Sequence, residues 1–174
     1  MPNADNVTWR VLTDADLETF RRMRLEALQS VPTAFTSGSA AEISRRAAQH
    51  RKGLTGSAEN FVLGAWQNDQ LAGFCGLLRE TDPKRRHTAW VWGLYVQPAF
   101  RGQRIGRGLL DQVAMRARHL QDMHHLLASA ISDNERALAL YQAAGFQVWG
   151  TEPGAILVED QLFDEIHLQL PLSS

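Results

Sequence analysis

Cysteine is nearly absent from this sequence of 174 residues. Cys75 is the only one, which excludes an intramolecular disulfide and a metal site built from several cysteines. No apolar run approaches the roughly 18 residues typical of a membrane-spanning helix. The N-terminus has neither the basic start nor the apolar stretch of a secretory signal. We therefore expect a cytoplasmic protein with no membrane partner.

Lysine is scarce as well, with two residues against 16 arginines. Codon usage in a GC-rich genome is the simpler explanation, although arginine also binds phosphate better than lysine does. The net charge of −1 argues against a nucleic-acid partner. No linker, repeat or low-complexity tract divides the chain. We therefore expect a single domain over residues 1–174, with residues 1–6 as a loose terminus.

Hydrophobic periodicity and turn residues predict a succession of strands and helices. The expected strands are 7–12, 60–66, 70–79, 88–96, 125–131, 146–150 and 165–170. The expected helices run from Asp14 or Asp16 to about Gln29, and over 41–52, 105–121 and 134–144. Alternation along strand 88–96 places these side chains on one face: Trp90, Trp92, Leu94 and Val96. The order predicts an α+β fold with a mixed, mostly antiparallel sheet of about six to seven strands and about four helices.

A loop rich in glycine and arginine leads directly into an amphipathic helix at residues 97–110. The first N–H groups of a helix have no partner within it, and the helix dipole adds partial positive charge there. Gly102 and Gly106 let the backbone approach a ligand closely. Three arginines add formal charge at the same end: Arg101, Arg104 and Arg107. The segment predicts a pyrophosphate site that is neither a P-loop nor a dinucleotide fingerprint; an ordinary surface helix is the alternative.

This segment resembles the acyl-CoA-binding signature of the GNAT superfamily of N-acyltransferases, Gln/Arg-x-x-Gly-x-Gly/Ala. Here it reads Arg101-Gly102-Gln103-Arg104-Ile105-Gly106, with Arg104 in place of the middle glycine. Binding through backbone N–H groups survives that replacement, since arginine also supplies an N–H. The replacement requires Arg104 to adopt backbone angles that are allowed for a residue with a Cβ.

A second stretch resembles the other marker of the same family, in which an asparagine, a tyrosine and a Gly-Phe pair follow one another around a short helix. Asn134, Tyr141 and Gly145-Phe146 stand at the family's spacing. Asn134 also suits the helix N-cap, and Ser132 with Glu135 fits a capping box. The resemblance implies that Tyr141 is the general acid that protonates the leaving thiolate, a role that suits a phenol with a pKa near 10. A packed core aromatic is the alternative for Tyr141.

The resemblance further implies a fold in which the strand before the loop splays from a parallel neighbour at the CoA site. Its freed backbone groups, most of all that of Val96, would bind the pantetheine arm and the thioester carbonyl. The implied co-substrate is acetyl-CoA, with an amine acceptor and no metal. The implied cofactor-binding residues are Leu94, Tyr95, Val96, Arg101, Gly102, Gln103, Arg104, Ile105, Gly106, Arg107, Asn134 and Tyr141.

The base that deprotonates the amine has no clear candidate, because residues 87–93 contain no carboxylate. His87, Glu26 and a water relay remain open. Residues 152–165 carry five acidic and no basic side chains, so an acidic rim could attract a cationic amine; a solvated acidic loop is the alternative. The loop 30–39 is a candidate for the opposite wall of the acceptor site.

The sequence thus predicts an N-acetyltransferase that moves an acetyl group from acetyl-CoA to a primary amine of a small molecule or protein in a ternary complex. A non-catalytic acyl-CoA-binding regulatory module is the alternative. His124 and His125 do not suggest a metal, because adjacent residues on a strand point to opposite faces. A homodimer stays open.

Overall fold

A seven-stranded mixed sheet runs through the structure, a computed structural model that describes residues 6–30, 54 and 56–172. The strands lie side by side in the order β1-β2-β3-β4-β5-β7-β6. Among them β4 and β5 run parallel, and the other neighbouring pairs are antiparallel. Their bounds are β1 Val7–Val11, β2 Asn60–Gln67, β3 Gln70–Arg79, β4 Thr88–Val96, β5 His125–Ile131, β6 Gln147–Val158 and β7 Gln161–Pro171.

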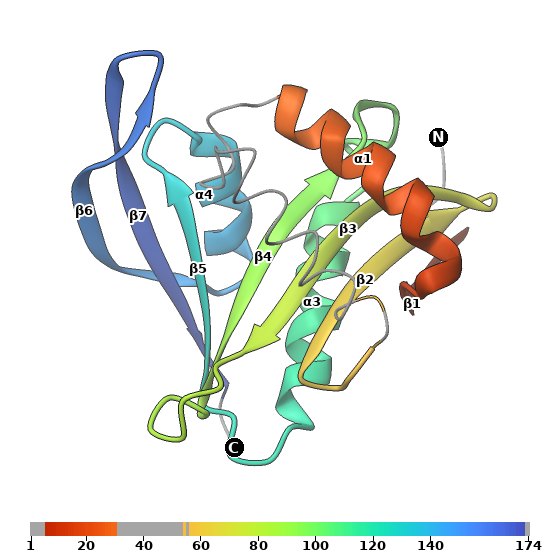
Figure 1. The fold of residues 1–174 in the computed structure, drawn as a ribbon, viewed down its shortest axis with the longest axis horizontal. Helices are drawn as coiled ribbons and strands as arrows, with labels where there is room; N and C mark the ends of the chain where they lie inside the picture. Colours follow the sequence, from red (N-terminus) through yellow and green to blue (C-terminus); the bar gives the residue numbers. More distant parts are fainter. Residues whose placement is uncertain (1–5, 31–53, 55, 173–174) are drawn as a thin grey trace.

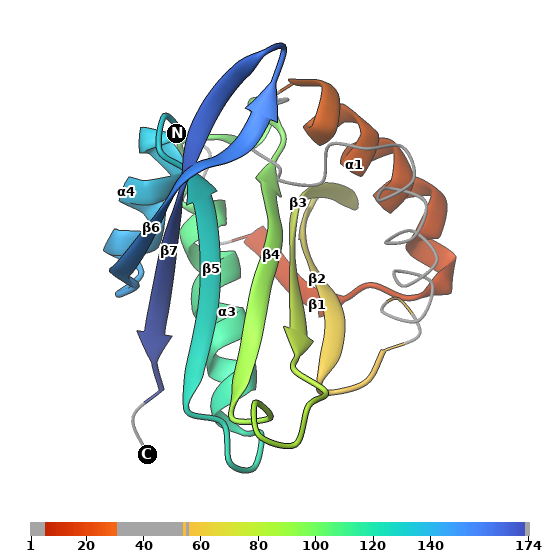
Figure 2. The ribbon, with the colours of Figure 1, turned by 60° about the vertical axis from the view of Figure 1, so that its left-hand side comes forward.

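Helices cover both faces of this sheet. Helix α1 (Leu17–Ser30) crosses one face, while α3 (Ile105–Arg118) and α4 (Glu135–Ala143) lie on the other (Figures 1 and 2). Two short 3-10 turns, η2 (Asp14–Asp16) and η3 (Pro98–Phe100), precede α1 and α3. The predicted α+β class is confirmed. The helix expected over 41–52 lies outside the described residues, and so does the wall expected over 30–39, apart from Ser30, which ends α1.

Each face of the sheet has its own apolar core. The larger core packs α3 and Tyr141 of α4 against β2 to β5 and β7, with Leu109 and Val113 of α3 fully buried. The smaller core packs Phe20 and Met23 of α1 against Phe74 of β3. The i, i+4 spacing of apolar residues in α3 explains why this helix could be predicted from the sequence: it buries one continuous face.

The prediction that Trp90, Trp92, Leu94 and Val96 share one face of β4 is wrong. Leu94 and Val96 pack against the larger core, whereas Trp92 packs against the smaller one. The cause is a β-bulge: three steps along β4, from Trp92 to Tyr95, oppose two steps along β3. Gly93 lies inside the bulge at φ +67°, a conformation that glycine adopts easily. The extra residue reverses the alternation between the faces.

The two closing strands are much longer than predicted. Instead of 146–150 and 165–170, β6 and β7 form a hairpin that extends through the acidic segment 152–165. Its two-residue turn, Glu159-Asp160, has positive φ at both positions, which matches the twist of a hairpin. The solvated acidic loop considered for this segment is therefore a pair of strands.

An ion pair at the start of α1 makes the stability of the fold depend on pH. The Asp16 carboxylate accepts hydrogen bonds from both terminal nitrogens of Arg10, at 2.7 and 2.8 Å, and from the backbone N–H of Thr13 at 2.8 Å. The Arg10 hydrogen bond is the main reason that the pKa of Asp16 falls from 3.8 to about 2, against the opposing effect of burial. The folded state therefore favours the ionised carboxylate, and this stabilisation is lost as pH falls from about 4 to about 2.

Replacing Asp16 with asparagine should lower the free energy of unfolding by about 2 kcal/mol near neutral pH, where the carboxylate is ionised. Near pH 2 the two proteins should differ little. Urea denaturation at both pH values measures the difference. Asp14→Asn, in the same turn but exposed, is the matched control and should change little. An equal effect of Asp16→Asn at both pH values would contradict the ionic origin of the stabilisation.

Candidate active site

The parallel strands β4 and β5 pair along only part of their length. The ladder joins Thr88–Trp90 to His125–Leu127, and beyond it the two strands separate. Figure 2 shows them close at one end and apart at the other. The facing backbone groups of Val91–Val96 and Ala128–Ile131 are thus not bonded to each other, so a ligand can bond to them. The splayed pair expected from the resemblance is present.

The loop after β4 turns the chain into α3 through two left-handed residues. Gly102 has φ +80°, and Arg104, the N-cap of α3, has φ +60° and ψ +14°. Arg104 thus adopts a left-handed conformation that glycine reaches more easily than other residues. An L-residue pays roughly 1–2 kcal/mol for it. At this departure from the motif, the backbone angles of Arg104 are therefore ones that a glycine can also adopt.

Gly106 is the point where this loop, the end of β4 and α4 meet. A Cβ added to Gly106 would lie 3.0 Å from Cδ2 of Leu140 and 3.6 Å from Cγ2 of Val96. Leu140 is on α4, and Val96 is the last residue of β4. The two motifs, separate in the sequence, therefore converge on the open end of the splayed strands. Ile105 anchors the first turn of α3 in the core, where it is 2% exposed.

The three arginines expected to surround a phosphate have different surroundings. The Nε of Arg101 donates to the carbonyl of Val96 at 2.9 Å, and its guanidinium lies 5.7 Å from the centre of the Tyr95 ring. Arg107 bonds both carboxylate oxygens of Asp111, at 2.9 and 3.0 Å, and the carbonyl of Ala143. Arg104 is exposed. Arg101 and Arg107 thus also tie the loop and α3 to their neighbours, and Arg104 is turned to solvent.

Asn134 and Ser132 behave differently at the start of α4. The Asn134 side chain accepts from the N–H of Ala137 at 3.1 Å, so its predicted capping role is confirmed. The capping box expected from Ser132 and Glu135 is wrong, because Asn134 is the N-cap and the Ser132 hydroxyl bonds Asp133 instead. In the loop before α3, the Gln103 side chain accepts from Gln67 at 3.2 Å.

Tyr141 lies in the larger core, on the side of the sheet that carries α3 and α4. It is 5% exposed and packs edge to face on Phe146, with ring centres 5.2 Å apart. Burial is the main cause that raises the pKa of its phenol, and nearby Cys75 adds to it. The phenol therefore stays protonated at physiological pH, as a general acid requires. The packing role considered for Tyr141 is also present.

Two of the candidate bases lie at opposite ends of β4. His87 precedes the strand where β4 and β5 pair, with its ring 5.9 Å from that of His124 and 6.3 Å from that of His125. This is the closed end of the splay, so His87 does not fit the role of base. Glu26 of α1 lies at the open end, where it contacts Tyr95 and Gln97. Sequence reasoning missed Gln97, because nothing distinguishes it from other loop residues.

An acidic cluster forms where β6 and β7 pair. Glu152 and Glu165 are directly opposite each other, and His167 contacts Glu152 at 3.4 Å. The ligand atoms of all three lie within 4.8 Å of one another. Trp149 stacks near His167, with ring centres 5.3 Å apart. Asp164 has a different role, because its carboxylate accepts from the N–H of Gly154 at 2.8 Å. The five acids of segment 152–165 are thus not equivalent.

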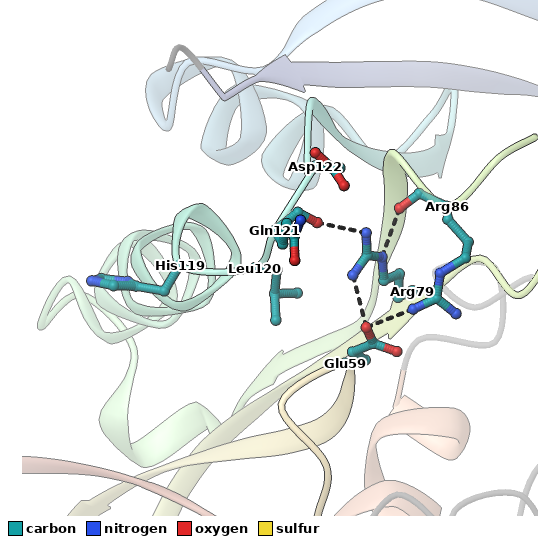
Figure 3. Close-up of a pocket in the computed structure, with 7 residues that line it drawn as sticks. All are labelled: Glu59, Arg79, Arg86, His119, Leu120, Gln121 and Asp122. Carbon is teal, nitrogen blue, oxygen red and sulfur yellow. Dashed lines mark hydrogen bonds and ion pairs between the residues drawn. The ribbon is translucent and has the colours of Figure 1, made fainter. Parts of the chain in front are cut away.

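A hollow at the far end of the sheet lies outside this site, and Arg79, which lines it, links several segments of the chain. Arg79, with a side chain 7% exposed, donates to the carbonyls of Arg86 at 2.6 Å and Gln121 at 2.7 Å, and to the Glu59 carboxylate at 2.7 Å (Figure 3). Arg86 reaches the same oxygen of Glu59 at 2.7 Å. This network joins the ends of β2 and β3 to the loop after α3.

Comparison with known proteins identifies the class. The model of the acetyltransferase (GNAT) family matches residues 23–146, so the chain belongs to this family. Its fold is similar to that of yncA from Salmonella typhimurium, solved with its cofactor acetyl-CoA (TM-score 0.81, 23% identity, 97% of this chain and 95% of that one). It is also similar to a phosphinothricin acetyltransferase from Sinorhizobium meliloti in complex with acetyl-CoA (TM-score 0.77, 21% identity, 97% and 89%).

A curated relative extends the comparison without naming an activity. An uncharacterised protein of Mycobacterium leprae is 33% identical over 96 residues, which cover 54% of this chain and 25% of that protein. The chain thus spans about a quarter of the length of the curated relative it matches. None of the helices in the described part of the chain is long and apolar enough to cross a membrane.

Proposed function

We propose that this chain is an N-acetyltransferase that transfers an acetyl group from acetyl-CoA to a primary amine by direct attack in a ternary complex. The observation that carries the proposal is the convergence at Gly106 of the end of β4, the left-handed loop and α4. This arrangement provides unpaired strand edges for the pantetheine arm and a helix N-terminus for the phosphates. The protein is proposed to act in the cytoplasm as one domain, with a homodimer open.

In the proposed reaction the amine nitrogen attacks the thioester carbonyl carbon, and the carbon–sulfur bond breaks. Backbone N–H groups at Leu94 to Val96 are proposed to hold the pantetheine and the carbonyl oxygen, where negative charge develops. Tyr141 donates its proton to the CoA thiolate as it leaves, and Asn134 positions the start of its helix. The remaining cofactor contacts are proposed for the loop 101–107.

A covalent route through cysteine is disfavoured by the position of Cys75. Its side chain is fully buried in β3, and burial raises the pKa of its thiol. A thiol becomes a good nucleophile only as the thiolate, which this environment opposes. Since the sequence has no other cysteine, direct attack by the amine is the route that the site supports.

The test is release of free thiol from acetyl-CoA in the presence of a panel of primary amines, alongside calorimetric binding of acetyl-CoA. Amine-dependent thiol release supports the enzyme. Binding without release across a broad panel would overturn it in favour of a non-catalytic acyl-CoA-binding module. The test includes this second function because β4 has no carboxylate near the splay that would act as a base.

The acidic cluster of β6 and β7 supports a cationic acceptor. Like charges placed directly opposite in a sheet repel each other, and a bound cation relieves that repulsion. The double variant Glu152→Gln/Glu165→Gln should raise KM for a cationic amine about tenfold while KM for acetyl-CoA changes little. Steady-state kinetics at low and high salt measure this. Glu159→Gln, in the exposed hairpin turn, is the control; an equal effect of the control would contradict a local role.

A further inference from the structure

Helix α1 supplies a carboxylate that β4 itself lacks. The Oε1 of Glu26 accepts a hydrogen bond from the Tyr95 hydroxyl at 2.8 Å, and its Oε2 lies 3.4 Å from Nε2 of Gln97. These partners are 69 and 71 positions away along the chain. The contact therefore results from the fold, which lays the C-terminal end of α1 beside the open end of β4 (Figures 1 and 2).

The partners of Glu26 flank the residue proposed to hold the thioester. Tyr95 and Gln97 stand on either side of Val96, and the Tyr95 ring packs into the smaller core, on the α1 face of the sheet. Tyr141 belongs to the larger core on the opposite face. The carboxylate and the phenol of Tyr141 thus lie on opposite sides of the sheet at its open end. Transfer of an acetyl group involves a proton lost by the amine and a proton gained by the thiol, and each side of the sheet offers one group for one of these tasks.

Two neutral side chains hold the Glu26 carboxylate without occupying all of its acceptor positions. Tyr95 is 5% exposed, and burial is the first cause that raises the pKa of its hydroxyl, so it stays a neutral donor. Gln97 cannot ionise. A carboxylate has about four acceptor positions, so these two donors leave room for the N–H of an ammonium group. Arginines on this side of the sheet include Arg101, 5.7 Å from the centre of the Tyr95 ring, and Arg24 of α1, 5.4 Å from the centre of the Trp92 ring.

We propose that Glu26 is the catalytic base of this site, with Tyr95 and Gln97 as positioning residues; the inference rests on the proposed function. One proton passes from the substrate ammonium to the Glu26 carboxylate. The nitrogen lone pair forms the new bond to the carbonyl carbon, the nitrogen loses its second proton to solvent, the carbon–sulfur bond breaks, and the thiolate takes the proton of Tyr141. Glu26 then releases its proton to solvent, and Tyr141 regains one from solvent.

The first test is Glu26→Gln, which keeps the shape and the hydrogen-bond acceptor for Tyr95 but cannot take a proton at neutral pH. With the best primary amine of the panel, kcat/KM near neutral pH should fall about 100-fold, while acetyl-CoA affinity and the melting temperature stay unchanged. The deficit should shrink as pH approaches the pKa of the amine, because the free amine then needs no base. Glu18→Gln, exposed on the same helix, is the control.

The second test separates proton removal from a structural role. An alkoxyamine of the same shape as the best amine is uncharged at neutral pH, so Glu26→Gln should slow its acetylation less than about threefold. Tyr95→Phe keeps the ring and should slow the amine about tenfold but spare the alkoxyamine. Equal losses with both acceptors would overturn the base assignment and indicate a structural role.

The outcomes also distinguish the two proposals. Wild-type protein that releases no thiol with any amine overturns the enzymatic function, and this inference with it. Wild-type protein that is active, with Glu26→Gln within about threefold of it toward the primary amine, overturns the role of Glu26 alone.

Discussion

Replacing Tyr141 with phenylalanine is expected to lower kcat about 100-fold or more and to leave the fold intact. The hydroxyl is the only group removed, and the ring keeps its edge-to-face contact with Phe146. The buried phenol, with its pKa raised above the ordinary value, carries a proton at any physiological pH. Without it the thiolate must leave unprotonated, which raises the barrier of the step in which the carbon–sulfur bond breaks.

The effect of Tyr141→Phe on turnover is measured by steady-state thiol release, with acetyl-CoA affinity and thermal unfolding as controls. We expect the loss in kcat with little change in either control, since a proton donor acts on the leaving group rather than on binding. Full turnover by Tyr141→Phe would contradict the acid assignment and leave the aromatic with its packing role only.

Gly73→Ala is expected to give the largest combined loss of stability and of cofactor binding. A Cβ at Gly73 would lie 2.5 Å from the carbonyl oxygen of Tyr95 and 3.2 Å from Cα of Val96. Backbone atoms cannot swing aside as a side chain does, so β4 itself must move. Overpacking of this kind costs about 3 kcal/mol. The displaced segment is the one proposed to bond the pantetheine arm, so acetyl-CoA affinity should fall at least about tenfold.

The matched control for Gly73→Ala is Gly150→Ala. Gly150 also lies within a strand, β6, and a Cβ added there meets nothing within 4 Å. Denaturant unfolding and calorimetric titration with acetyl-CoA should show losses for Gly73→Ala only. A Gly73→Ala protein that is destabilised but binds acetyl-CoA normally would contradict the proposed contact of the cofactor with the end of β4.

The fold class and the two motifs could be predicted because their signals are local. Helix α3 repeats its apolar residues every fourth position, and β5 was placed correctly at 125–131 as a continuous apolar run. The hairpin of β6 and β7 was not predicted at its full length. Pro153 and Gly154 interrupt it, and β6 is largely exposed, so neither hydrophobic alternation nor burial marks it as a strand.

Contacts between distant segments account for the rest of what the sequence could not show. The bulge at Gly93 looks like ordinary alternation in the sequence, because one extra residue is visible only against the register of β3. Arg101 is held by the carbonyl of Val96, and a backbone acceptor has no sequence signal. The pairing of Glu26 with Tyr95 joins two elements whose relative position depends on the whole sheet.

The most direct test of acetyl transfer uses acetyl-CoA labelled isotopically in its acetyl group, incubated with the protein and the best amine of the panel. Mass spectrometry should find the label on the amine, with one CoA thiol released for each labelled product, and no label on the protein. Bound acetyl-CoA with an unlabelled amine, or label retained covalently on the protein, would contradict direct transfer from acetyl-CoA to the acceptor.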